Sequence, residues 1–325
     1  MTTQLPKYLF ALLIFVLFHT ALAQQTQTIA FYNVENLFDT IDGPNDDAEF
    51  LPGAESKWDA SKYEAKIAHI RQVMADLNMP MVMGVCEIEN KSVLTDLIGN
   101  DKRYGIVHYD SPDARGIDVA MLYRKDLIKL KGSGNIRFTL PGDSIPTSRD
   151  IVWAKYQYKK EYLYVMVNHW PSRRGGAEES AARRLTAAKY ATHFIDSIQR
   201  SEPKAKIILM GDLNDHPQDA APQLIASKLT PQITKASGTF GGSYNYKNEW
   251  EIIDHIFVSN NAFNGTMALQ KESGTIHSFP YLLTEYKGQT VPNRTYAGPT
   301  APVWDAATAL SRSGYFTARP TTVSP

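Results

Sequence analysis

The chain alternates short, strongly apolar runs with polar segments, a pattern typical of strands and helices packed in layers. Apolar runs without helical spacing predict strands at residues 29–33, 81–86, 106–109, 118–123, 151–158, 162–167, 207–211 and 252–258. Apolar residues three or four positions apart predict helices at residues 61–79, 92–98 and about 178–199. The first helix is expected to begin with a Ser61–Glu64 capping box and to end before Pro80. Hairpins that alternate with long helices predict an α/β sandwich, with two sheets face to face and helices outside.

Polar residues that suit phosphate chemistry lie at the ends of these apolar runs. They are Asn33, Glu35, Asn36, Glu87, Glu89, Asn168, His169, Asp212, Asn214 and Asp254. Buried strands that each deliver a carboxylate or an imidazole to a shared sheet edge can build a metal-assisted hydrolytic site. The sequence therefore predicts one site assembled from several strands.

Glu87 is the first candidate for a metal ligand, because it follows the apolar run 81–86 directly. Mg²⁺ usually takes one or two protein carboxylates together with water and substrate phosphate oxygens. Glu89 lies two residues further on, with the same alternation, and is a weaker candidate. The alternative for Glu87 is a strand-end salt bridge.

The segment from Gly211 to Asn214 is the sharpest local signal in the sequence. A glycine permits a tight bend where a strand ends. Asp212 and Asn214, two positions apart, can point the same way; the carboxylate can accept a proton from water, and the amide can hold a phosphate oxygen. The alternative is an Asx turn that caps the next segment.

His169 ends another apolar run and precedes a loop that contains Arg173 and Arg174. An imidazolium donor beside a basic loop suits a phosphodiester, although a structural histidine and a solvated loop remain alternatives. Asp254 and His255 point to opposite faces of their strand. We expect Asp254 in the site and His255 packed on the other side.

The N-terminal residues 1–23 predict a secretory signal peptide. One positive charge precedes an apolar core at residues 8–18, and Ala21 to Ala23 suit cleavage before Gln24. The apolar core is too short for a comfortable membrane span. We therefore expect export to the periplasm or the medium, without stable membrane association; an uncleaved anchor is the alternative. Cys86 is the only cysteine and is expected in the core.

Residues 24–300 are predicted to form one domain, followed by an atypical, irregular tail at residues 301–325. The numbers of basic and acidic residues are equal, so the formal net charge of zero gives no global attraction to nucleic acid. A local basic rim remains compatible with this balance. Its candidate residues are Arg173, Arg174, Arg183 and Arg184.

Six segments together form a recognisable set of motifs. They are residues 31–38, 87–90, 115–120, 168–173, 211–214 and 253–254. Their order and spacing resemble the endonuclease/exonuclease/phosphatase superfamily over about residues 28–298, and the first and fourth segments most resemble a bacterial secreted branch. The resemblance implies a four-layer α/β/β/α sandwich of the deoxyribonuclease-like type and Mg²⁺- or Mn²⁺-assisted hydrolysis of phosphoesters.

The resemblance also assigns roles to individual residues. It implies metal binding by Glu87 and Glu35. It implies phosphate binding by Asn33, Asn168, Arg115 and Arg173. It implies catalysis by His169, Asp212, Asn214 and Asp254, in which Asp212 activates water and Asp254 orients a last catalytic histidine.

The chain departs from the superfamily pattern near its end. The superfamily ends with Ser-Asp-His and an apolar strand, whereas no histidine follows His277 here and Asp305 lacks a histidine beside it. We also expect the final strand to be absent. A frameshifted or replaced 3′ end of the gene is one hypothesis for this difference, and the coding DNA would test it.

These observations predict an exported, monomeric, metal-dependent phosphodiester hydrolase that uses in-line attack of water, with nucleic acid as the expected substrate. A phospholipid or sphingomyelin phosphodiesterase is one alternative, although the sequence shows no convincing exposed aromatic hairpin. A small phosphomonoesterase is another. The third is a non-catalytic binding protein on a degenerate scaffold that lacks the terminal Asp-His.

Overall fold

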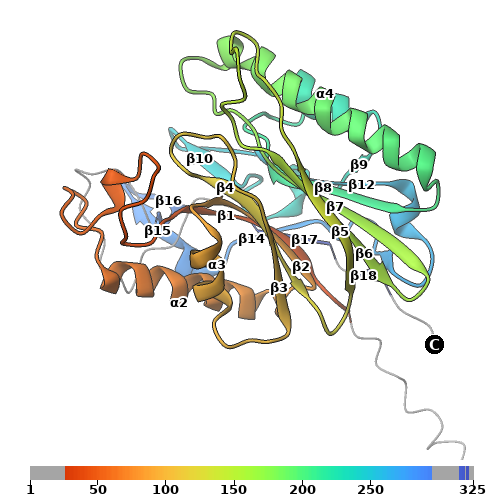
Figure 1. Cartoon of the computed structure of the whole chain (residues 1–325), viewed down its shortest axis with the longest axis horizontal. Helices are drawn as coiled ribbons and strands as arrows, with labels where there is room; N and C mark the ends of the chain where they lie inside the picture. Colours follow the sequence, from red (N-terminus) through yellow and green to blue (C-terminus); the bar gives the residue numbers. More distant parts are fainter. Residues whose placement is uncertain (1–25, 295–314, 319, 322–325) are drawn as a thin grey trace, which may run out of the picture.

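The computed structural model describes residues 26–294 and two short strands at residues 315–318 and 320–321. Within these residues, two six-stranded sheets form the centre of the molecule (Figure 1). The first sheet has the order β14 (Thr275–His277), β17 (Tyr315–Ala318), β1 (Ile29–Leu37), β2 (Val82–Ile88), β4 (Asp118–Arg124) and β3 (Tyr104–His108). The second has the order β5 (Lys129–Ile136), β6 (Ile151–Tyr158), β7 (Glu161–His169), β8 (Lys206–Asp212), β12 (Asp254–Val258) and β9 (Thr230–Pro231).

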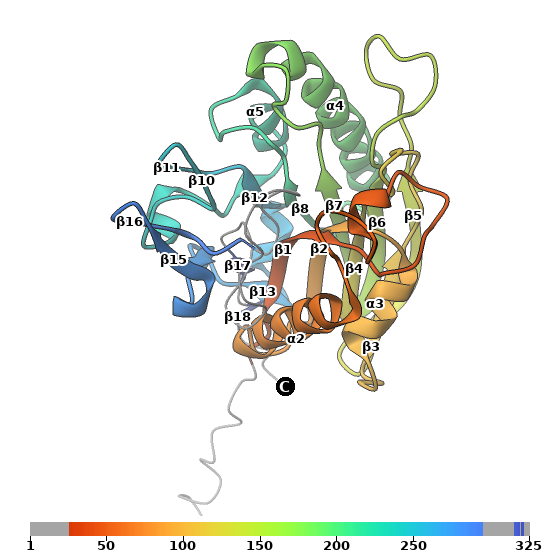
Figure 2. The same cartoon turned by 90° about the vertical axis from the view of Figure 1, so that its left-hand side faces the viewer.

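Helices cover the outer faces of both sheets, which gives four layers (Figures 1 and 2). The helices are α2 (Ala60–Asp76) and α3 (Lys91–Ile98) on the first sheet, and α4 (Ala177–Ser201) and α5 (Ala220–Ala226) on the second. Short 3₁₀ turns are η1 (Ala48–Phe50), η2 (Lys235–Ser237), η3 (Asn260–Phe263) and η4 (Pro280–Leu282). The four-layer sandwich expected from the sequence is confirmed. No helix among residues 26–294 combines the length and the apolar character that a membrane span requires.

Three small two-stranded sheets complete the described structure. They pair β10 (Tyr244–Tyr246) with β11 (Glu249–Glu251), β13 (Ala268–Leu269) with β18 (Pro320–Thr321), and β15 (Leu283–Tyr286) with β16 (Gln289–Pro292). The hairpins β10–β11 and β15–β16 carry the exposed tyrosines Tyr246 and Tyr286 beside their turns. These exposed aromatic residues were not apparent from the sequence pattern.

The apolar core between the two sheets is thin enough to require a glycine at one point. Phe31 and Val82 of the first sheet and Val167 and Met210 of the second belong to one buried cluster. A Cβ atom on Gly84 would lie 2.7 Å from Met210 Sδ and 2.8 Å from Val167 Cγ2. Because protein interiors are close-packed, a side chain at this position would displace the Met210 and Val167 side chains of the opposite sheet. The close approach brings the ends of β2, β7 and β8 together.

Several local expectations differ from the structure. Helix α2 is capped by Asp59, whose side chain accepts a hydrogen bond from Lys62 N, so the Ser61–Glu64 capping box is wrong. The final strand expected to be absent is present: β17 pairs antiparallel with both β1 and β14. The segment expected to be irregular therefore contributes strands β17 and β18. The expected signal peptide, residues 1–23, and Asp305 lie outside the described residues.

Candidate active site

Irregularities in two neighbouring strands deliver the first polar groups to the site. The register between β1 and β2 shifts between Asn33 and Leu37, and Glu35 and Asn36 adopt φ values of 55° and 57°. Glu87 in β2 also has a positive φ of 62°, where the register to β4 shifts. Bulges of this kind re-aim side chains and are common beside active sites. Here they let Asn36 N donate a hydrogen bond of 3.0 Å to Glu87 Oε2.

Asn33 joins the two acidic groups at the centre of the site. Its side-chain Nδ2 donates to Glu87 Oε1 at 2.9 Å and to Asp212 Oδ2 at 3.1 Å. His169 Nε2 lies 3.9 Å from Asp212 Oδ2. One ligand atom each from Glu87, His169 and Asp212 can be chosen so that all three lie within 4.8 Å of one another. The three side chains are buried, so they converge on a largely enclosed point.

The end of β8 positions Asp212 tightly against β7. A Cβ atom on Gly211 would lie 2.1 Å from the carbonyl oxygen of Asn168, so only glycine allows this approach of the two backbones. Asp212 Oδ1 accepts a hydrogen bond of 3.0 Å from Asn214 N, which is the Asx turn considered as the alternative for this segment. Asn214 Nδ2 donates to Trp170 O at 3.0 Å. The turn and a cavity-facing carboxylate therefore occur together.

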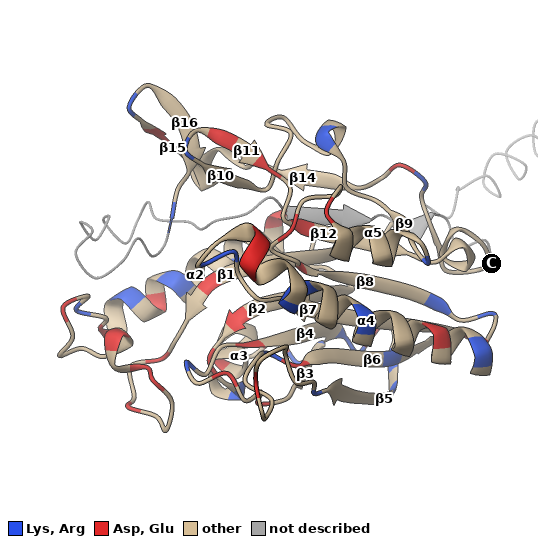
Figure 3. Cartoon of the chain, turned by 90° about the horizontal axis from the view of Figure 1, so that it is seen from above, with Lys and Arg blue, Asp and Glu red and all other residues tan. Residues whose placement is uncertain are grey.

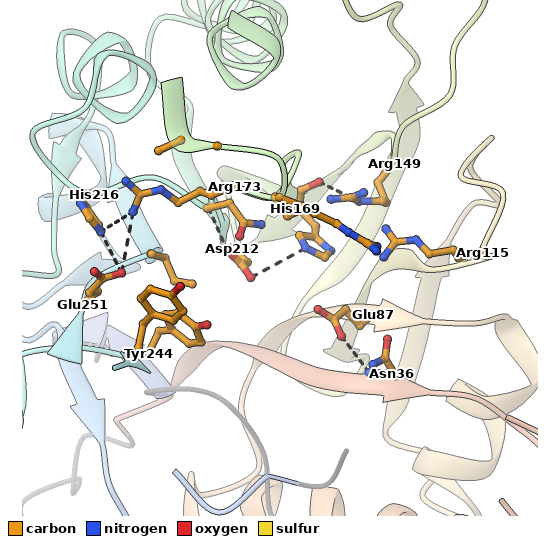
Figure 4. Close-up of a pocket in the computed structure, with 17 residues that line it drawn as sticks. Asn36, Glu87, Arg115, Arg149, His169, Arg173, Asp212, His216, Tyr244 and Glu251 are labelled. Atoms are coloured by element: carbon orange, nitrogen blue, oxygen red, sulfur yellow. Dashed lines mark hydrogen bonds and ion pairs between the residues drawn. The ribbon is translucent and has the colours of Figure 1, made fainter. Parts of the chain in front are cut away.

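A cavity of about 770 Å³ opens over these residues (Figure 4). Its lining combines the acidic group, four arginines and residues of the β10–β11 hairpin. The lining residues are Asn36, Glu87, Arg115, Arg149, His169, Ser172, Arg173, Arg174, Gly176, Ala177, Asp212, Asn214, His216, Tyr244, Tyr246, Glu251 and Ile253. Figure 4 shows His169 and Asp212 between Glu87 on one side and the Arg173–His216–Glu251 group on the other. Cationic side chains around a carboxylate pair suit a phosphate group.

Arg149 is a site residue that the sequence pattern did not reveal. Its guanidinium donates to the carbonyl oxygens of His169 at 3.2 Å and Trp170 at 2.7 Å, and forms an ion pair of 2.9 Å with Asp113. It thereby fixes the backbone that carries His169. His216, Glu251 and the two tyrosines of the β10–β11 hairpin were also missed. None of these residues ends a long apolar run, so no sequence signal marked them.

Two predicted site residues lie away from the cavity, and a third lies beside the site without lining the cavity. Asn168, expected to bind phosphate, is fully buried: its Oδ1 accepts from Trp170 Nε1, and its Nδ2 donates to Met210 O. Strand alternation explains this, because Asn168 and His169 are adjacent and point to opposite faces. Glu35, expected to bind metal, instead forms an ion pair of 2.6 Å with Arg294. Asp254 is the register partner of Asp212 in the β8–β12 pair, but it does not line the cavity.

His255 occupies the opposite side of β12, as its strand position predicts. It is buried, its ring stacks with Phe257 at 5.5 Å, and its Nε2 hydrogen-bonds Asp215 O at 2.9 Å. Burial lowers the pKa of His255 to about 4, so the imidazole is neutral near neutral pH. Its contacts are therefore those of a residue packed in the protein interior, outside the cavity.

Charged residues are mixed over the rest of the molecule. Figure 3 shows basic and acidic segments interspersed along α2 and α4. The equal numbers of basic and acidic residues agree with this distribution. The arginines of the cavity are thus a local feature.

The donor set at the centre of the cavity fits a divalent cation. Glu87 and Asp212 offer carboxylate oxygens and His169 offers an imidazole nitrogen. Oxygen ligands suit Mg²⁺, and Mn²⁺ accepts the same oxygen-rich set with an imidazole. A second group within the described residues, His108, Asp110 and Asp118, has comparable spacing but lies outside the cavity.

Known structures share the fold of this chain. The catalytic domain of human Nocturnin, solved with a bound sulfate anion, aligns with a TM-score of 0.60 and 15% identity over 92% of this chain and 96% of its own. D. rerio TDP2, solved with a single-strand DNA product, aligns with a TM-score of 0.57 and 15% identity over 92% of this chain and 100% of its own. A mannosyl-6-phosphatase of Bacteroides thetaiotaomicron aligns with a TM-score of 0.57 and 14% identity over 90% of this chain and 98% of its own. A search of curated proteins found no match.

The sequence itself matches a family model along most of its length. The model is that of the Endonuclease/Exonuclease/phosphatase family, and it covers residues 28–302. Enzymes of this family are divalent-metal-dependent hydrolases, which agrees with the grouping of Glu87, His169 and Asp212. The superfamily resemblance drawn from the motifs is confirmed. The chain belongs to the endonuclease/exonuclease/phosphatase family and is a hydrolase that acts on phosphoric ester bonds.

Proposed function

We propose that this hydrolase is a divalent-metal-dependent phosphodiesterase that cleaves nucleic acid. One observation carries the proposal: Glu87, His169 and Asp212 converge within 4.8 Å in a cavity whose other walls carry arginines. The acidic group suits a metal and the arginines suit the phosphate backbone. The acidic group and the arginines together therefore suit a divalent cation and a phosphodiester bound side by side.

Each central side chain has a role in this proposal. Glu87 and His169 would hold the divalent cation beside Asp212, and the cation would polarise a phosphoryl oxygen. Asp212 accepts the proton of the attacking water, and Asn33 holds the carboxylate in place through its 3.1 Å hydrogen bond. The guanidinium group of Arg115 lines the cavity and stabilises negative charge that develops on the phosphate, while Arg149 holds the backbone that carries His169.

A small phosphomonoester is the second candidate substrate. The observation that favours it is that the arginines cluster in the cavity, while basic and acidic residues are interspersed along α2 and α4 and the net charge is zero. Proteins that bind long nucleic acids commonly carry an extended basic surface. The two candidates differ in product, since only a monoesterase releases inorganic phosphate from a sugar phosphate.

Plasmid nicking tests the proposal. Purified protein is incubated with supercoiled plasmid in Mg²⁺, in Mn²⁺ and in EDTA, alongside Asp212→Ala. Asp126→Ala is the matched control, because this carboxylate lies on the surface in an ion pair with Arg124. We expect nicking that requires metal, that Asp212→Ala loses by about 10²–10⁴-fold, and that Asp126→Ala keeps.

The other outcomes are equally definite. Release of inorganic phosphate from sugar phosphates without nicking favours the second candidate. Metal-independent nicking, or nicking retained by Asp212→Ala, contradicts the proposed mechanism. Absence of both activities contradicts catalysis on either substrate.

Export and a monomeric state complete the proposal. Export rests on the sequence, in which an apolar N-terminal core is followed by Ala21 to Ala23. N-terminal sequencing of the protein recovered outside the cytoplasm should begin at Gln24. Light scattering should give the mass of one chain; a cytoplasmic, uncleaved or dimeric product would contradict these expectations.

A further inference from the structure

The β10–β11 hairpin forms one wall of the cavity and has two chemically different faces. Its turn consists of Lys247 and Asn248, with φ values of 49° and 72°, which are typical of a tight hairpin turn. In its register Tyr244 pairs with Glu251 across the strands. Residues two apart, and residues directly opposite, share a face of a hairpin. Tyr244, Tyr246 and Glu251 therefore lie on one face.

The opposite face of the hairpin packs against the segment that leads into it. Trp250, paired with Asn245, stacks on Phe240 with ring centroids 4.6 Å apart and an interplanar angle of 20°. A Cβ atom on Gly242 would lie 2.6 Å from Glu251 N, so the chain passes very close to the hairpin backbone. The wall is thus packed from behind, and its tyrosine face is presented to the cavity in a set position.

The cavity face combines flat aromatic surface with hydrogen-bonding groups. The rings of Tyr244 and Tyr246 are nearly parallel, at 15°, with centroids 6.4 Å apart, and Tyr246 is 51% exposed. Beside them, Glu251 Oε2 lies 3.1 Å from His216 Nε2 and 3.9 Å from Arg173 Nη1. Arg173 Nη1 in turn lies 2.7 Å from His216 Nε2. Figure 4 shows this group across the cavity from Glu87 and Asn36.

We infer that the tyrosine face of the β10–β11 hairpin is a nucleoside subsite, which takes the base next to the phosphate that is cleaved beside Asp212. The inference rests on the proposed action on nucleic acid and adds residues that bind the base. Exposed aromatic faces stack on any base, because every base has a π-face. The Glu251 carboxylate accepts hydrogen bonds from base amino groups, and the Arg173 guanidinium donates to base oxygens.

The size and chemistry of the cavity agree with a bound nucleotide. A volume of about 770 Å³ lies within the usual range of sites for small organic ligands, roughly 300–1,000 Å³. The acidic group at Glu87 and the aromatic wall occupy opposite sides of this one cavity. A substrate that fills both sides must therefore carry a phosphoester and a flat group, which a nucleotide does.

Two chromogenic substrates separate the subsite from the chemistry. Methyl p-nitrophenyl phosphate has no flat group besides its leaving group, whereas thymidine 5′-(p-nitrophenyl phosphate) carries a base beside the same leaving group. We expect Tyr246→Ala to lower kcat/KM about 5- to 150-fold for the thymidine substrate, the range of base–aromatic stacking, and to leave the other substrate unchanged. Tyr246→Phe keeps the ring and should keep the preference.

Tyr286→Ala is the matched control. Tyr286 is 53% exposed at the turn of the β15–β16 hairpin, does not line the cavity, and has Lys287 Nζ 5.2 Å from its ring centroid, as Lys247 Nζ is from Tyr246. It should affect neither substrate. An unchanged preference in Tyr246→Ala, or an equal loss in Tyr286→Ala, overturns the subsite.

Binding distinguishes failure of the subsite from failure of the proposed function. If the wild type hydrolyses neither substrate and does not nick plasmid, the proposed function fails, and calorimetry with thymidine 5′-phosphate and 2-deoxyribose 5-phosphate decides the subsite alone. Weaker binding of only the thymidine compound by Tyr246→Ala supports it. Equal binding of thymidine 5′-phosphate by the wild type and Tyr246→Ala overturns it.

Discussion

The side-chain amide of Asn33 lies 3.1 Å from Asp212 Oδ2, so one hydrogen bond inside the cavity joins β1 of the first sheet to β8 of the second. The same amide nitrogen also donates to Glu87. It therefore stands between two buried carboxylates that would otherwise face each other. A donor in this position satisfies both carboxylates. Its loss would leave buried acceptors without a hydrogen bond, which is energetically costly.

Asn33→Asp should destabilise the protein in a metal-dependent way. The substitution replaces the shared donor by a third carboxylate, and we expect a loss of about 1–3 kcal/mol in the free energy of unfolding in EDTA. Excess Mg²⁺ should restore part of it, since a cation reduces the repulsion. Urea unfolding with and without metal measures the difference. Asn135→Asp, which faces Asp150 outside the cavity, is the control and should not respond to Mg²⁺.

Metal binding should depend on Glu87 and not on Glu35. A cation that binds only the folded state raises the free energy of unfolding by about 2.7 kcal/mol at a hundredfold excess over Kd. We expect Glu87→Gln to lose this increment. Glu35→Gln should keep it, because the Glu35 carboxylate is 2.6 Å from the Arg294 guanidinium. Thermal unfolding across a Mg²⁺ titration measures both; the reverse result would restore Glu35 as the ligand.

Arg149→Met should weaken both the fold and the activity. The Arg149 side chain is 7% exposed and shares a buried ion pair with Asp113. Removal of one partner of a buried pair costs about 3–5 kcal/mol, and we expect the lower end because Arg115 also contacts Asp113. Arg103→Met removes a solvent-exposed pair and should change little. Chemical denaturation compares them, and equal losses would contradict a special role for Arg149.

His255 should make the protein less stable in acid. Its pKa is lowered by burial to about 4, against about 6.5 in the unfolded chain. Between these values the unfolded state binds a proton that the folded state does not, so stability falls as the pH drops from about 6.5 to 4. The loss approaches about 3 kcal/mol below pH 4, from 1.36 kcal/mol per pKa unit, and is absent at pH 8.

Two variants isolate this effect. His255→Phe cannot take up the proton, so its free energy of unfolding should vary less with pH across that window than that of the wild type. His193→Phe removes an exposed histidine on α4 and should leave the pH dependence unchanged. Parallel curves for the wild type and His255→Phe would exclude His255 as the source.

The layered fold could be predicted because its central strands are nearly continuous apolar runs. Strands β2 and β8 are buried along their whole length, and their sequences show it. Strand β5 was missed because it lies at a sheet edge, with exposed and half-buried residues and a polar sequence. Strand β17 was missed for a different reason: its pairing with β1 joins distant parts of the chain, which periodicity does not reveal.

The site was predictable only where chemistry coincides with strand ends. Glu87, His169 and Asp212 follow apolar runs, and the sheets bring them together. Asn168 was predicted in the site from its motif, which ignores the alternation of side chains along a strand, and its side chain is buried outside the cavity. Arg149 and Glu251 were missed because their places depend on loops and a short hairpin, whose contacts arise from the tertiary fold alone.

The hydrogen bond between Asn33 and Asp212 also means that catalysis depends on the folding of the whole domain. The two residues are 179 positions apart and belong to different sheets, so neither half of the chain holds a working centre alone. A newly made or partly unfolded chain carries every reactive side chain without the arrangement that makes them an enzyme. Catalysis therefore requires that both sheets have folded against each other.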